Sequence, residues 1–410
     1  MSKRKMKDSG VEWLGEIPAE WDLVPARNLF SEVKDKNIDG KVTRQFSFRY
    51  GKIVDKDKSG RSDVTTDETI TAYRIVTPDT IMINGLNLNY DFISQRVAIV
   101  EERGIITSAY LALCPNKKLI EPAFAVYLFK GYDSKQVFHG HGSGIRKTLN
   151  YSDFKEIKTV CPDLSTQRKI AAYLDGRCAK IDEMVSDAKK TIEEYKAWKS
   201  SVIFEAVTGK CKIENGECKI GGWAMRESGV EWIGMIPEGW RVNRVKRIVR
   251  VENGSDPLTE GSIPVYGSGE SSFKTCGEFK EGPTVLLGRK GATLHIPHYI
   301  EGRYWNVDTA FDVRMKGNDN LRWFYYLAIS FDYKAYISKT TLPSMTQSNY
   351  NNMHVPHPPV TEQCAIAAFL DKKCAAIDRV IAGKEALIAD LEAYKKSLIF
   401  ECVTGKMEVA

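Results

Sequence analysis

The sequence predicts an α+β protein with a pseudo-two-fold internal repeat, in which two globular modules alternate with two long antiparallel coiled-coil helices. Three observations predict this fold. A short motif occurs twice, as DSGVEWLGEIPAEW at 8–21 and as ESGVEWIGMIPEGW at 227–240. The segment 165–210 recurs without a gap at 361–406. The stretches between the two motifs share little sequence until just before each long segment begins.

The repeats divide the chain into five parts. We predict a first module at 1–164, a first helix at 165–210, a linker at 211–226, a second module at 227–360 and a second helix at 361–410. With 410 residues, of which 43% are hydrophobic, each module is long enough to bury a core of its own.

Each long segment is expected to be helical throughout, because no proline interrupts it and apolar residues recur at alternating steps of four and three. Ser165 or Thr166, and Thr361, are candidate N-caps, and a Thr-Gly-Lys stop follows at 208–210 and 404–406. A helix of this length with one apolar seam must pair. A homodimeric coiled coil is possible, but the second helix of the same chain is the favoured partner. The predicted seam consists of Leu174, Cys178, Ile181, Val185, Ile192, Tyr195, Val202, Leu370, Cys374, Ile377, Ile381, Ile388, Leu391 and Leu398.

The two modules are each predicted to mix short strands with one short helix. In the first module the strands are expected at 46–54, 73–76, 80–84, 96–100 and 109–115, with a helix near 122–130. In the second they are expected at 262–269, 284–297 and 303–315, with a helix near 320–330.

Basic, amide and hydroxyl side chains concentrate near the predicted loops of both modules. Arg and Lys suit phosphate and guanine, and Asn and Gln suit adenine. A solvated surface charge is the simpler explanation for any single residue, but the set indicates nucleic acid, which the net charge of +6 favours without requiring it. The predicted contacts are Arg49, Lys52, Arg61, Asn84, Asn87, Arg96, Arg146 and Lys147 in the first module, and Lys274, Arg289, Lys290, Lys339, Ser344, Thr346, Gln347 and Asn349 in the second.

Several other patterns have more than one explanation. Gly-Arg-Lys-Gly at 288–291 could bring backbone close to a phosphate or form a tight hairpin turn. His-Gly-His-Gly-Ser-Gly at 139–144 is expected to be a mobile loop, since such freedom is poor metal-ligand geometry. The paired tryptophans Trp13 and Trp21, with Trp232 and Trp240, are expected to cap a core.

The sequence also argues against several classes of protein. Nine cysteines without a CxxC pair indicate neither a disulfide framework nor zinc, so Cys211 and Cys218 are expected to be thiols. There is no GxxxxGK[ST] loop, and no Asn-Pro-Pro-aromatic tetrapeptide of an adenine methyltransferase. Neither a signal peptide nor an apolar run of about 20 residues is apparent, which predicts a cytoplasmic protein.

The doubled GVEW-G-IP-W motif, the doubled Gln-x3-Ala-Ala-x-Leu-Asp helix and the closing Glu-x-Val-Thr-Gly-Lys resemble the specificity subunit of type I restriction-modification systems. The likeness covers nearly the whole chain. Residues 46–54 and 139–149 are similar to one subtype of its target recognition domain, and 263–272, 284–292 and 306–311 to another. One departure is Ser165-Thr166-Gln167, which stands where the family commonly has Pro-x-x-Glu-Gln, although Thr361-Glu362-Gln363 conforms.

The resemblance implies a non-catalytic subunit in which each target recognition domain binds one half of a bipartite asymmetric DNA sequence. It also implies that the paired helices set the spacing and dock two methyltransferase subunits, which methylate adenine N6, and that translocase-nuclease subunits join this core. S-adenosylmethionine, ATP and Mg²⁺ are then expected on the partners, with no cofactor or metal in this chain. The rival hypotheses are an enzyme that acts alone and a scaffold that binds only proteins.

Overall fold

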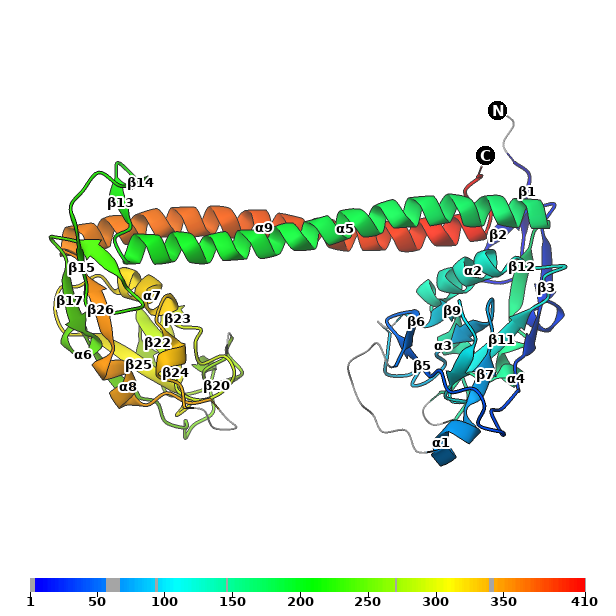
Figure 1. Ribbon diagram of the computed structural model, residues 1–410, viewed down its shortest axis with the longest axis horizontal. Coiled ribbons are helices and arrows are strands. Elements are labelled where there is room, and N and C mark those ends of the chain that lie inside the picture. The colour runs from blue at the N-terminus through cyan, green and yellow to red at the C-terminus, as the bar shows by residue number, and fades with distance from the viewer. Residues whose placement is uncertain are drawn as a thin grey trace. The chain divides into compact units, whose positions relative to one another are not determined.

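The computed structural model describes residues 4–56, 67–92, 95–144, 147–269, 271–338 and 343–409. It divides into two compact units, unit 1 of Met1–Ala188 with Ala386–Ala410, and unit 2 of Lys189–Glu385. Each unit joins a module of short strands and helices to one half of each of two 44-residue helices, α5 (Leu164–Val207) and α9 (Val360–Val403) (Figure 1). The predicted α+β class with two modules and two long helices is confirmed.

Within each unit the halves of α5 and α9 lie antiparallel. In unit 1, Cys178 lies near Cys402, and Asp182, one turn further along α5, pairs with Lys395 at 2.6 Å. In unit 2, Lys199 pairs with Asp378 at 2.7 Å. Asp182 and Lys199 correspond through the repeat to Asp378 and Lys395, so both units use the same register. Lys199 and Lys395, at matched positions of the two helices, therefore each have a partner on the facing helix.

Every residue of the predicted seam is buried or half-buried. Leu174, Cys178, Ile181 and Val185 join the core of unit 1 together with Leu398. Leu370 and Cys374 join the core of unit 2, against which Val202 packs. Each half of the helix pair is thus part of the hydrophobic core of its own module.

The long helices begin differently from the prediction. The carboxylate of Asp163 accepts hydrogen bonds from the amides of Ser165 (2.9 Å) and Thr166 (3.1 Å), so Asp163 is the N-cap of α5 and both predicted caps lie inside the first turn. Thr361 is likewise inside α9, which follows Pro358-Pro359. Asp163 lies two residues before the repeated segment, so the repeat does not reveal this cap.

Both long helices end at a glycine with positive φ, as predicted. Gly209 has φ +75° and Gly405 has φ +72°. After α5, the amides of Gly209 and Lys210 donate to the carbonyls of Ala206 (3.4 Å) and Glu205 (2.9 Å), which is a Schellman ending.

The doubled short motif packs against these helix ends. An added Cβ on Gly209 would lie 2.7 Å from Pro237 Cγ and 3.1 Å from Trp240 Cζ3. An added Cβ on Gly405 would lie 2.6 Å from Pro18 Cδ and 3.0 Å from Trp21 Cη2. Trp21 and Trp240 are buried, as the core-capping prediction requires. In each unit, therefore, one copy of the short motif packs against the end of one copy of the long repeat.

The two modules share a topology despite their unlike sequences. In unit 1 a sheet has the order β4-β11-β8-β9, and in unit 2 a sheet has the order β18-β25-β22-β23. All neighbours in both are antiparallel. The strands are β4 (Phe30–Glu32), β8 (Ile81–Ile83), β9 (Val97–Ile99) and β11 (Leu111–Pro115), and β18 (Val249–Asn253), β22 (Thr284–Gly288), β23 (His298–Ile300) and β25 (Ala310–Met315).

Flanking elements match as well. The short motifs form the hairpins β1–β2 (Met6–Asp8, Glu16–Pro18) and β15–β16 (Met225–Glu227, Met235–Pro237). Next come the pairs β3–β12 (Asp22–Pro25, Lys158–Cys161) and β17–β26 (Arg241–Arg244, His354–His357). The matching short helices are η1 (Ala26–Asn28) and α6 (Val245–Ile248), α2 (Pro122–Ser134) and α7 (Leu321–Ile329), and α4 (Tyr151–Phe154) and α8 (Gln347–Asn352).

Buried glutamines at matched positions attach each module to the start of a long helix. The side-chain oxygen of Gln167 accepts from the amide of Glu121, the N-cap of α2, at 2.7 Å. Gln363 accepts from the amide of Asn320, the N-cap of α7, at 2.7 Å. About two helical turns further along the long helices, Asp175 accepts from a tyrosine hydroxyl of α2 and Asp371 from one of α7, both at 2.7 Å.

The modules also differ from each other and from the prediction. The segment 46–54 forms two strands, β5 (Phe46–Arg49) and β6 (Lys52–Asp55), because Tyr50 and Gly51 adopt positive φ and turn the chain. Unit 1 further contains α1 (Asp67–Ala72), the pair β7–β10 (Arg74–Val76, Gly104–Ile106) and α3 (Val137–His141). Unit 2 instead adds a second sheet, β20-β19-β24-β21 (Lys274–Cys276, Ile263–Tyr266, Arg303–Asn306, Lys280–Glu281), and η3 (Tyr333–Ala335).

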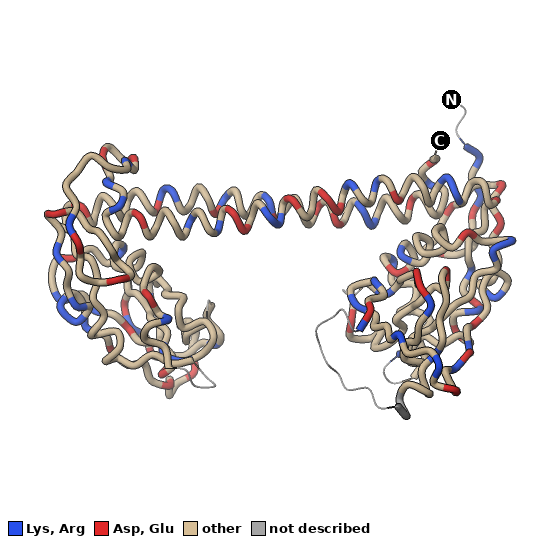
Figure 2. The backbone as a smooth tube through the Cα atoms, viewed as in Figure 1, with Lys and Arg blue, Asp and Glu red and all other residues tan. Residues whose placement is uncertain are grey.

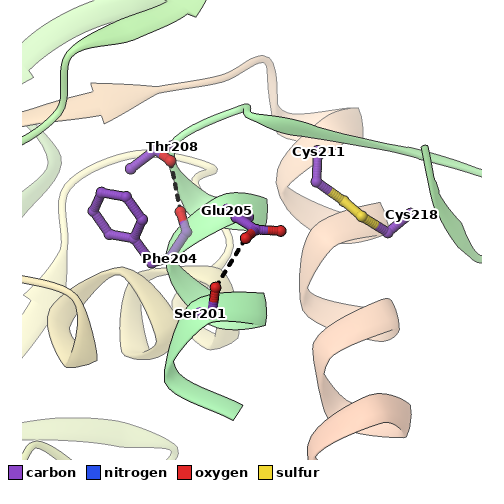
Figure 3. Close-up of a disulfide and its surroundings, with 6 residues drawn as sticks. All are labelled: Ser201, Phe204, Glu205, Thr208, Cys211 and Cys218. Atoms are coloured by element: carbon purple, nitrogen blue, oxygen red, sulfur yellow. Dashed lines mark hydrogen bonds between the residues drawn. A yellow bond between two sulfur atoms is a disulfide. The ribbon is translucent and has the colours of Figure 1, made fainter. Parts of the chain in front are cut away.

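The predicted linker at 211–226 contains a hairpin, β13–β14 (Cys211–Glu214, Glu217–Ile220). Figure 3 shows that Cys211 and Cys218 form a disulfide across it, beside the end of α5, where Thr208 bonds to the carbonyl of Phe204. The prediction of two thiols was therefore wrong. The hairpin explains the difference, because Cys211 pairs with Ile220 and Cys218 pairs with Ile213, so the two cysteines are diagonal neighbours with Cα atoms 5.5 Å apart.

Replacing Gly209 by Ala is expected to destabilise unit 2 more than replacing Gly229 by Ala. Both glycines have φ between +73° and +75°, so each alanine costs about 1–3 kcal/mol of backbone strain. Only at Gly209 does the new methyl also collide with Pro237, whereas at Gly229 it meets nothing within 4 Å. Urea unfolding of the two variants measures the difference, and equal losses would show that the contact with Pro237 contributes nothing.

Candidate nucleic-acid interface

One arrangement of backbone hydrogen bonds occurs in both modules and gathers most of the predicted contact residues. In unit 1 the loop after β8 is joined to the segment before α4, since Leu149 N donates to Gly85 O (2.9 Å) and Leu88 N donates to Lys147 O (3.0 Å). In unit 2 the loop after β22 is joined to the segment before α8. There Met345 N donates to Arg289 O (2.9 Å) and Gly291 N donates to Pro343 O (3.0 Å).

We call this arrangement the loop clamp. Lys147 and Leu149 lie 196 positions before Pro343 and Met345, the same offset that relates the long helices. The next residue caps a short helix in each unit, because Asn150 accepts from Asp153 N and Thr346 accepts from Asn349 N, both at 3.1 Å. The two modules thus hold equivalent loops in the same way, while the side chains on those loops differ.

In unit 1 the loop clamp brings together Asn84, Asn87 and Lys147. Asn87 and Lys147 are exposed and have φ of 53° and 39°, so the backbone is left-handed at both. Asn84 is half-buried, and its Oδ1 accepts from Leu86 N at 3.2 Å, which leaves the amide NH₂ group for a further partner.

Arg49 and Lys52 face each other across the β5–β6 hairpin, whose tip residue Tyr50 is 90% exposed. An added Cβ on Gly51 would lie 2.7 Å from the side-chain oxygen of Gln95, so the tip packs beside the strand that follows the loop. A hollow of about 950 Å³ opens beside the hairpin, and its lining includes Arg44, Arg49 and Lys52.

Arg96 does not belong among the contact residues. Its side chain is 1% exposed, and its guanidinium donates to the carbonyls of Asn84 (2.9 Å), Leu86 (2.9 Å) and Asp91 (2.5 Å). The sequence could not show this, because an arginine that opens a strand after a polar loop has the same pattern whether it points outward or inward. Arg96 is a positioning residue that fixes the loop carrying Asn84 and Asn87.

Asp133 lies beneath the same loop and accepts from Arg96 N at 3.3 Å. Burial raises the pKa of Asp133 to about 6, against the opposing effect of Arg96. The carboxyl group lies close enough to the buried guanidinium of Arg96 for that charge to lower its pKa.

The segment 139–144 is not wholly a loop, contrary to prediction. Its first residues end α3, and His139 stacks on Phe92 with ring centroids 5.0 Å apart. His139 Nε2 lies 3.1 Å from Asp91 O, so packing against the loop orders this histidine. Across the described ranges, His, Cys, Asp and Glu nowhere gather in a group of three or more that could hold a metal ion.

In unit 2, Arg289 and Lys290 flank one carboxylate. Their nitrogens lie 3.9 and 3.6 Å from Asp308 Oδ2, and both side chains are half-buried. Of the two explanations proposed for 288–291, the tight hairpin turn does not hold, and the close approach of backbone to a phosphate remains a prediction. The amides of Arg289 and Gly291 donate to Thr309 O and Pro343 O and are not free for a phosphate. The turn is not tight, because the last pair of the β22–β23 ladder is Leu286 with His298, and the chain between these two residues forms a long loop.

The polar residues around α8 are partly engaged within the protein. Asn349 Nδ2 donates to Tyr336 O at 2.6 Å, Gln347 Nε2 donates to Val251 O, and Ser344 Oγ lies 2.8 Å from Ser338 Oγ. Thr346 and Gln347 remain exposed. Lys274 is exposed on β20, apart from the loop clamp. Arg61, Arg146 and Lys339 lie outside the described residues.

Exposed aromatic side chains that were not predicted lie beside the predicted contacts. Tyr90 is 74% exposed and Phe92 57% exposed on the loop of Asn87, and Phe273 is 61% exposed next to Lys274. The sequence does indicate their exposure, because aromatic residues flanked by polar residues in a predicted loop have no core to enter.

Comparisons with known proteins agree with this architecture. Residues 237–389 match the family described as type I restriction modification DNA specificity domain. The chain is 25% identical to a protein assigned as the MjaX type I restriction enzyme specificity subunit of Methanocaldococcus jannaschii, over 97% of this chain and 96% of that one. It is 21% identical to the MjaVIII specificity subunit of the same organism, over 96% and 94%.

Two solved structures share the fold. One, from work on complex assembly and conformational transition of the type I R-M system, has a TM-score of 0.72 at 15% identity and covers 95% of this chain and 99% of its own. The HsdS subunit of Thermoanaerobacter tengcongensis has a TM-score of 0.52 at 16% identity, over 95% and 98%.

The duplicated fold presents unlike polar surfaces on equivalent loops, and the family model that matches the second module describes a DNA specificity domain. Residues 237–389 match the DNA specificity domain of type I restriction-modification systems, and the chain is similar along nearly its whole length to type I restriction enzyme specificity subunits. None of its described helices combines the length and the hydropathy that a membrane span needs.

Replacing Arg96 by Met is expected to loosen the loop at 84–92, because three carbonyls lose a buried donor and the cost is about 2–4 kcal/mol. Lys52→Met is the control, since an exposed cation of similar length changes stability by about 0.5 kcal/mol or less. Limited proteolysis of the loop, with urea unfolding, measures the effect. Equal protease resistance in the two variants would contradict the assignment.

Proposed function

We propose that the chain is the non-catalytic DNA-specificity subunit of a type I restriction-modification complex, and that each module binds one half of a bipartite asymmetric target. The observation that carries the proposal is the loop clamp. One backbone frame occurs in both modules and displays different side chains, as expected if one docking geometry serves two different base sequences.

The polar side chains of the two clamps support this division. The first offers the amide of Asn87 and the ammonium of Lys147, which suit adenine and phosphate. The second offers Arg289 and Lys290, which suit guanine and phosphate, with the hydroxyl of Thr346 beside them. We propose that the other predicted contact residues, Arg96 excepted, line the same two interfaces.

We propose that the paired helices set the unread gap between the two half-sites. A continuous helix of 44 residues is about 66 Å long at 1.5 Å per residue. The matched ion pairs Asp182–Lys395 and Lys199–Asp378 place the facing helices in the same register within each unit.

We further propose that the helices dock two methyltransferase subunits. An aromatic–cation–aromatic surface occurs once in each unit at matched positions. In unit 1 it is Tyr173, Arg177 and the 51% exposed Tyr394, and in unit 2 it is Phe369, Lys373 and the 44% exposed Trp198. Lys373 Nζ lies 4.7 Å from the Trp198 ring centroid. Two equal surfaces on one chain suit two copies of one partner.

In this proposal the chemistry belongs to the partners. The methyltransferase subunits hold S-adenosylmethionine, the translocase-nuclease subunits that join through them use ATP and Mg²⁺, and this chain holds no cofactor. The complex works in the cytoplasm, where its DNA target lies.

Exchanging residues 22–164 for the equivalent module of a relative is expected to change one half of the target and leave the other, because each module reads alone. Mapping methylated adenines in cells that express the chain with its methyltransferase partners measures both halves.

Inserting four residues after Ala188 is expected to lengthen the gap between the half-sites by a base pair or more, because four residues add about 6 Å to the helix. The same map of methylated adenines measures the gap.

A change in both half-sites after the module exchange would refute independent reading. An unchanged gap after the insertion would show that the helices do not set it. Methylation or cleavage by the purified chain without partners would instead support an enzyme that acts alone, and a complex whose DNA binding ignores salt and sequence would support a protein scaffold.

Replacing Trp198 or Tyr394 by Ala is expected to weaken the binding of one methyltransferase subunit by about tenfold, since a central aromatic anchor is worth about 1–2 kcal/mol or more. The double variant should weaken both. Native mass spectrometry at graded concentrations measures the stoichiometry. Leu258→Ala, a 93% exposed residue between β18 and β19, is the control, and wild-type assembly of the double variant would exclude these surfaces.

A further inference from the structure

A strongly basic surface of unit 2 lies outside the loop clamp and was not predicted. It consists of Arg244 of β17, Lys246 and Arg247 of α6, Arg250 of β18, and Arg314 and Lys316 at the end of β25, all of them exposed. We call it the basic flank. Figure 2 shows the cations of β17 and α6 as a concentration of blue on this module.

The fold draws these six cations together. Arg250 and Arg314 are direct partners across the β18–β25 pair, and the ammonium of Lys316 donates to the carbonyl of Lys246 at 2.7 Å. Like charges opposite each other in a sheet are destabilising. Glu252 lies 3.0 Å from Arg250, and Asp312 lies 3.3 Å from Arg314. Asp312 is fully buried and also pairs with Lys280, so the surface keeps a large positive excess.

The basic flank offers charge without an apolar centre. Val245, Ile248, Val249 and Val251, which alternate with its cations, are at most 1% exposed. Protein interfaces have a desolvated core that is rich in aromatic residues and poor in lysine. A surface of Arg and Lys on short strands and a helix, with the apolar residues turned inward, instead suits a regular polyanion such as the phosphate backbone of DNA.

The basic flank adjoins the second loop clamp. Gln347, at the start of α8, donates to the carbonyl of Val251, and Val245 N donates to Met353 O at 2.9 Å. The helix that carries Thr346 and Gln347 at its start is therefore bonded to the strand that carries Arg250. DNA held at this loop clamp would have its next phosphates within reach of the flank.

At the corresponding positions, all of which the structure describes, the first module has a single cation. Counting back 219 positions, the offset of the short motifs, Arg244, Arg247 and Arg250 become Pro25, Asn28 and Ser31. Lys246 becomes Arg27, which pairs with Glu156. The basic flank is thus a feature of the second module alone and is not required by the repeated scaffold.

We propose that the basic flank binds the phosphate backbone of duplex DNA beyond the half-site that the second module reads. The inference rests on the proposed function, because it takes the second loop clamp as the base-reading site. It makes the two ends of the target unequal, since the complex grips DNA over a longer stretch at the second module than at the first.

The test uses the assembled complex with its methyltransferase subunits and two duplexes that carry the mapped target. One duplex ends at the outer edge of the second half-site, and the other continues for about one further helical turn of roughly 10 base pairs. The wild type is expected to bind the longer duplex about tenfold more tightly. Lys246→Gln with Arg247→Gln should abolish this preference and reduce the salt slope on the longer duplex by up to about 2, at about 0.9 per phosphate.

Two control variants separate the basic flank from net charge. Lys212→Gln with Lys219→Gln removes the same charge from the β13–β14 hairpin and should keep the length preference. Lys246→Arg with Arg247→Lys keeps the charge and should also keep it. On the shorter duplex, both Gln variants should discriminate target from scrambled sequence as the wild type does.

Three results would overturn the proposal. These are an equal affinity of the wild type for both duplexes, an unchanged preference in the Lys246→Gln, Arg247→Gln variant, or a failure of that variant to assemble with its partners, which would make the basic flank a protein interface. A wild type that does not discriminate target from scrambled sequence on the shorter duplex would instead refute the proposed function.

Discussion

The contact on which the rest of the structure depends is the packing of a left-handed glycine at the end of each long helix against a proline and a tryptophan of the short motif. Gly405 receives Pro18 and Trp21, and Gly209 receives Pro237 and Trp240. No other residue type would allow this approach, because the added Cβ would occupy the space of the ring. The contact explains why a Thr-Gly-Lys ending and an Ile-Pro-x-x-Trp segment are both repeated, although they are far apart in the chain.

Each module is held to the helices at a second point. The buried Gln167 and Gln363 bond to the first residues of α2 and α7. In unit 1 the module is thus attached to the end of α9 by its short motif and to the start of α5 by its glutamine. Unit 2 repeats this with the helices exchanged. A module attached to two antiparallel helices cannot rotate about either one, so the loops it carries have a fixed direction relative to its half of the helix pair.

The repeated parts of the fold were predictable from the sequence, and the parts that form the candidate site were only partly so. Apolar residues at steps of three and four predict a helix that pairs along one side. The glycines of the Thr-Gly-Lys segments predict where each helix ends, and that depends only on local sequence. The shared sheet order of the modules was hidden, because β8 and β22 bury different apolar residues in the same place. Arg96 was misassigned because the direction of a side chain at a strand end depends on tertiary packing. The disulfide depends on a hairpin register that a polar linker does not reveal.

The loop clamp is made only of peptide groups. Its four hydrogen bonds join amides to carbonyls at Gly85, Leu88, Lys147 and Leu149 in one unit and at Arg289, Gly291, Pro343 and Met345 in the other. Main-chain bonds of this kind survive most changes of side chain. New residues can therefore be tried on the reading loops without dismantling the frame that presents them, so a fold of this design can acquire new sequence preferences by point substitution while its stability stays nearly constant.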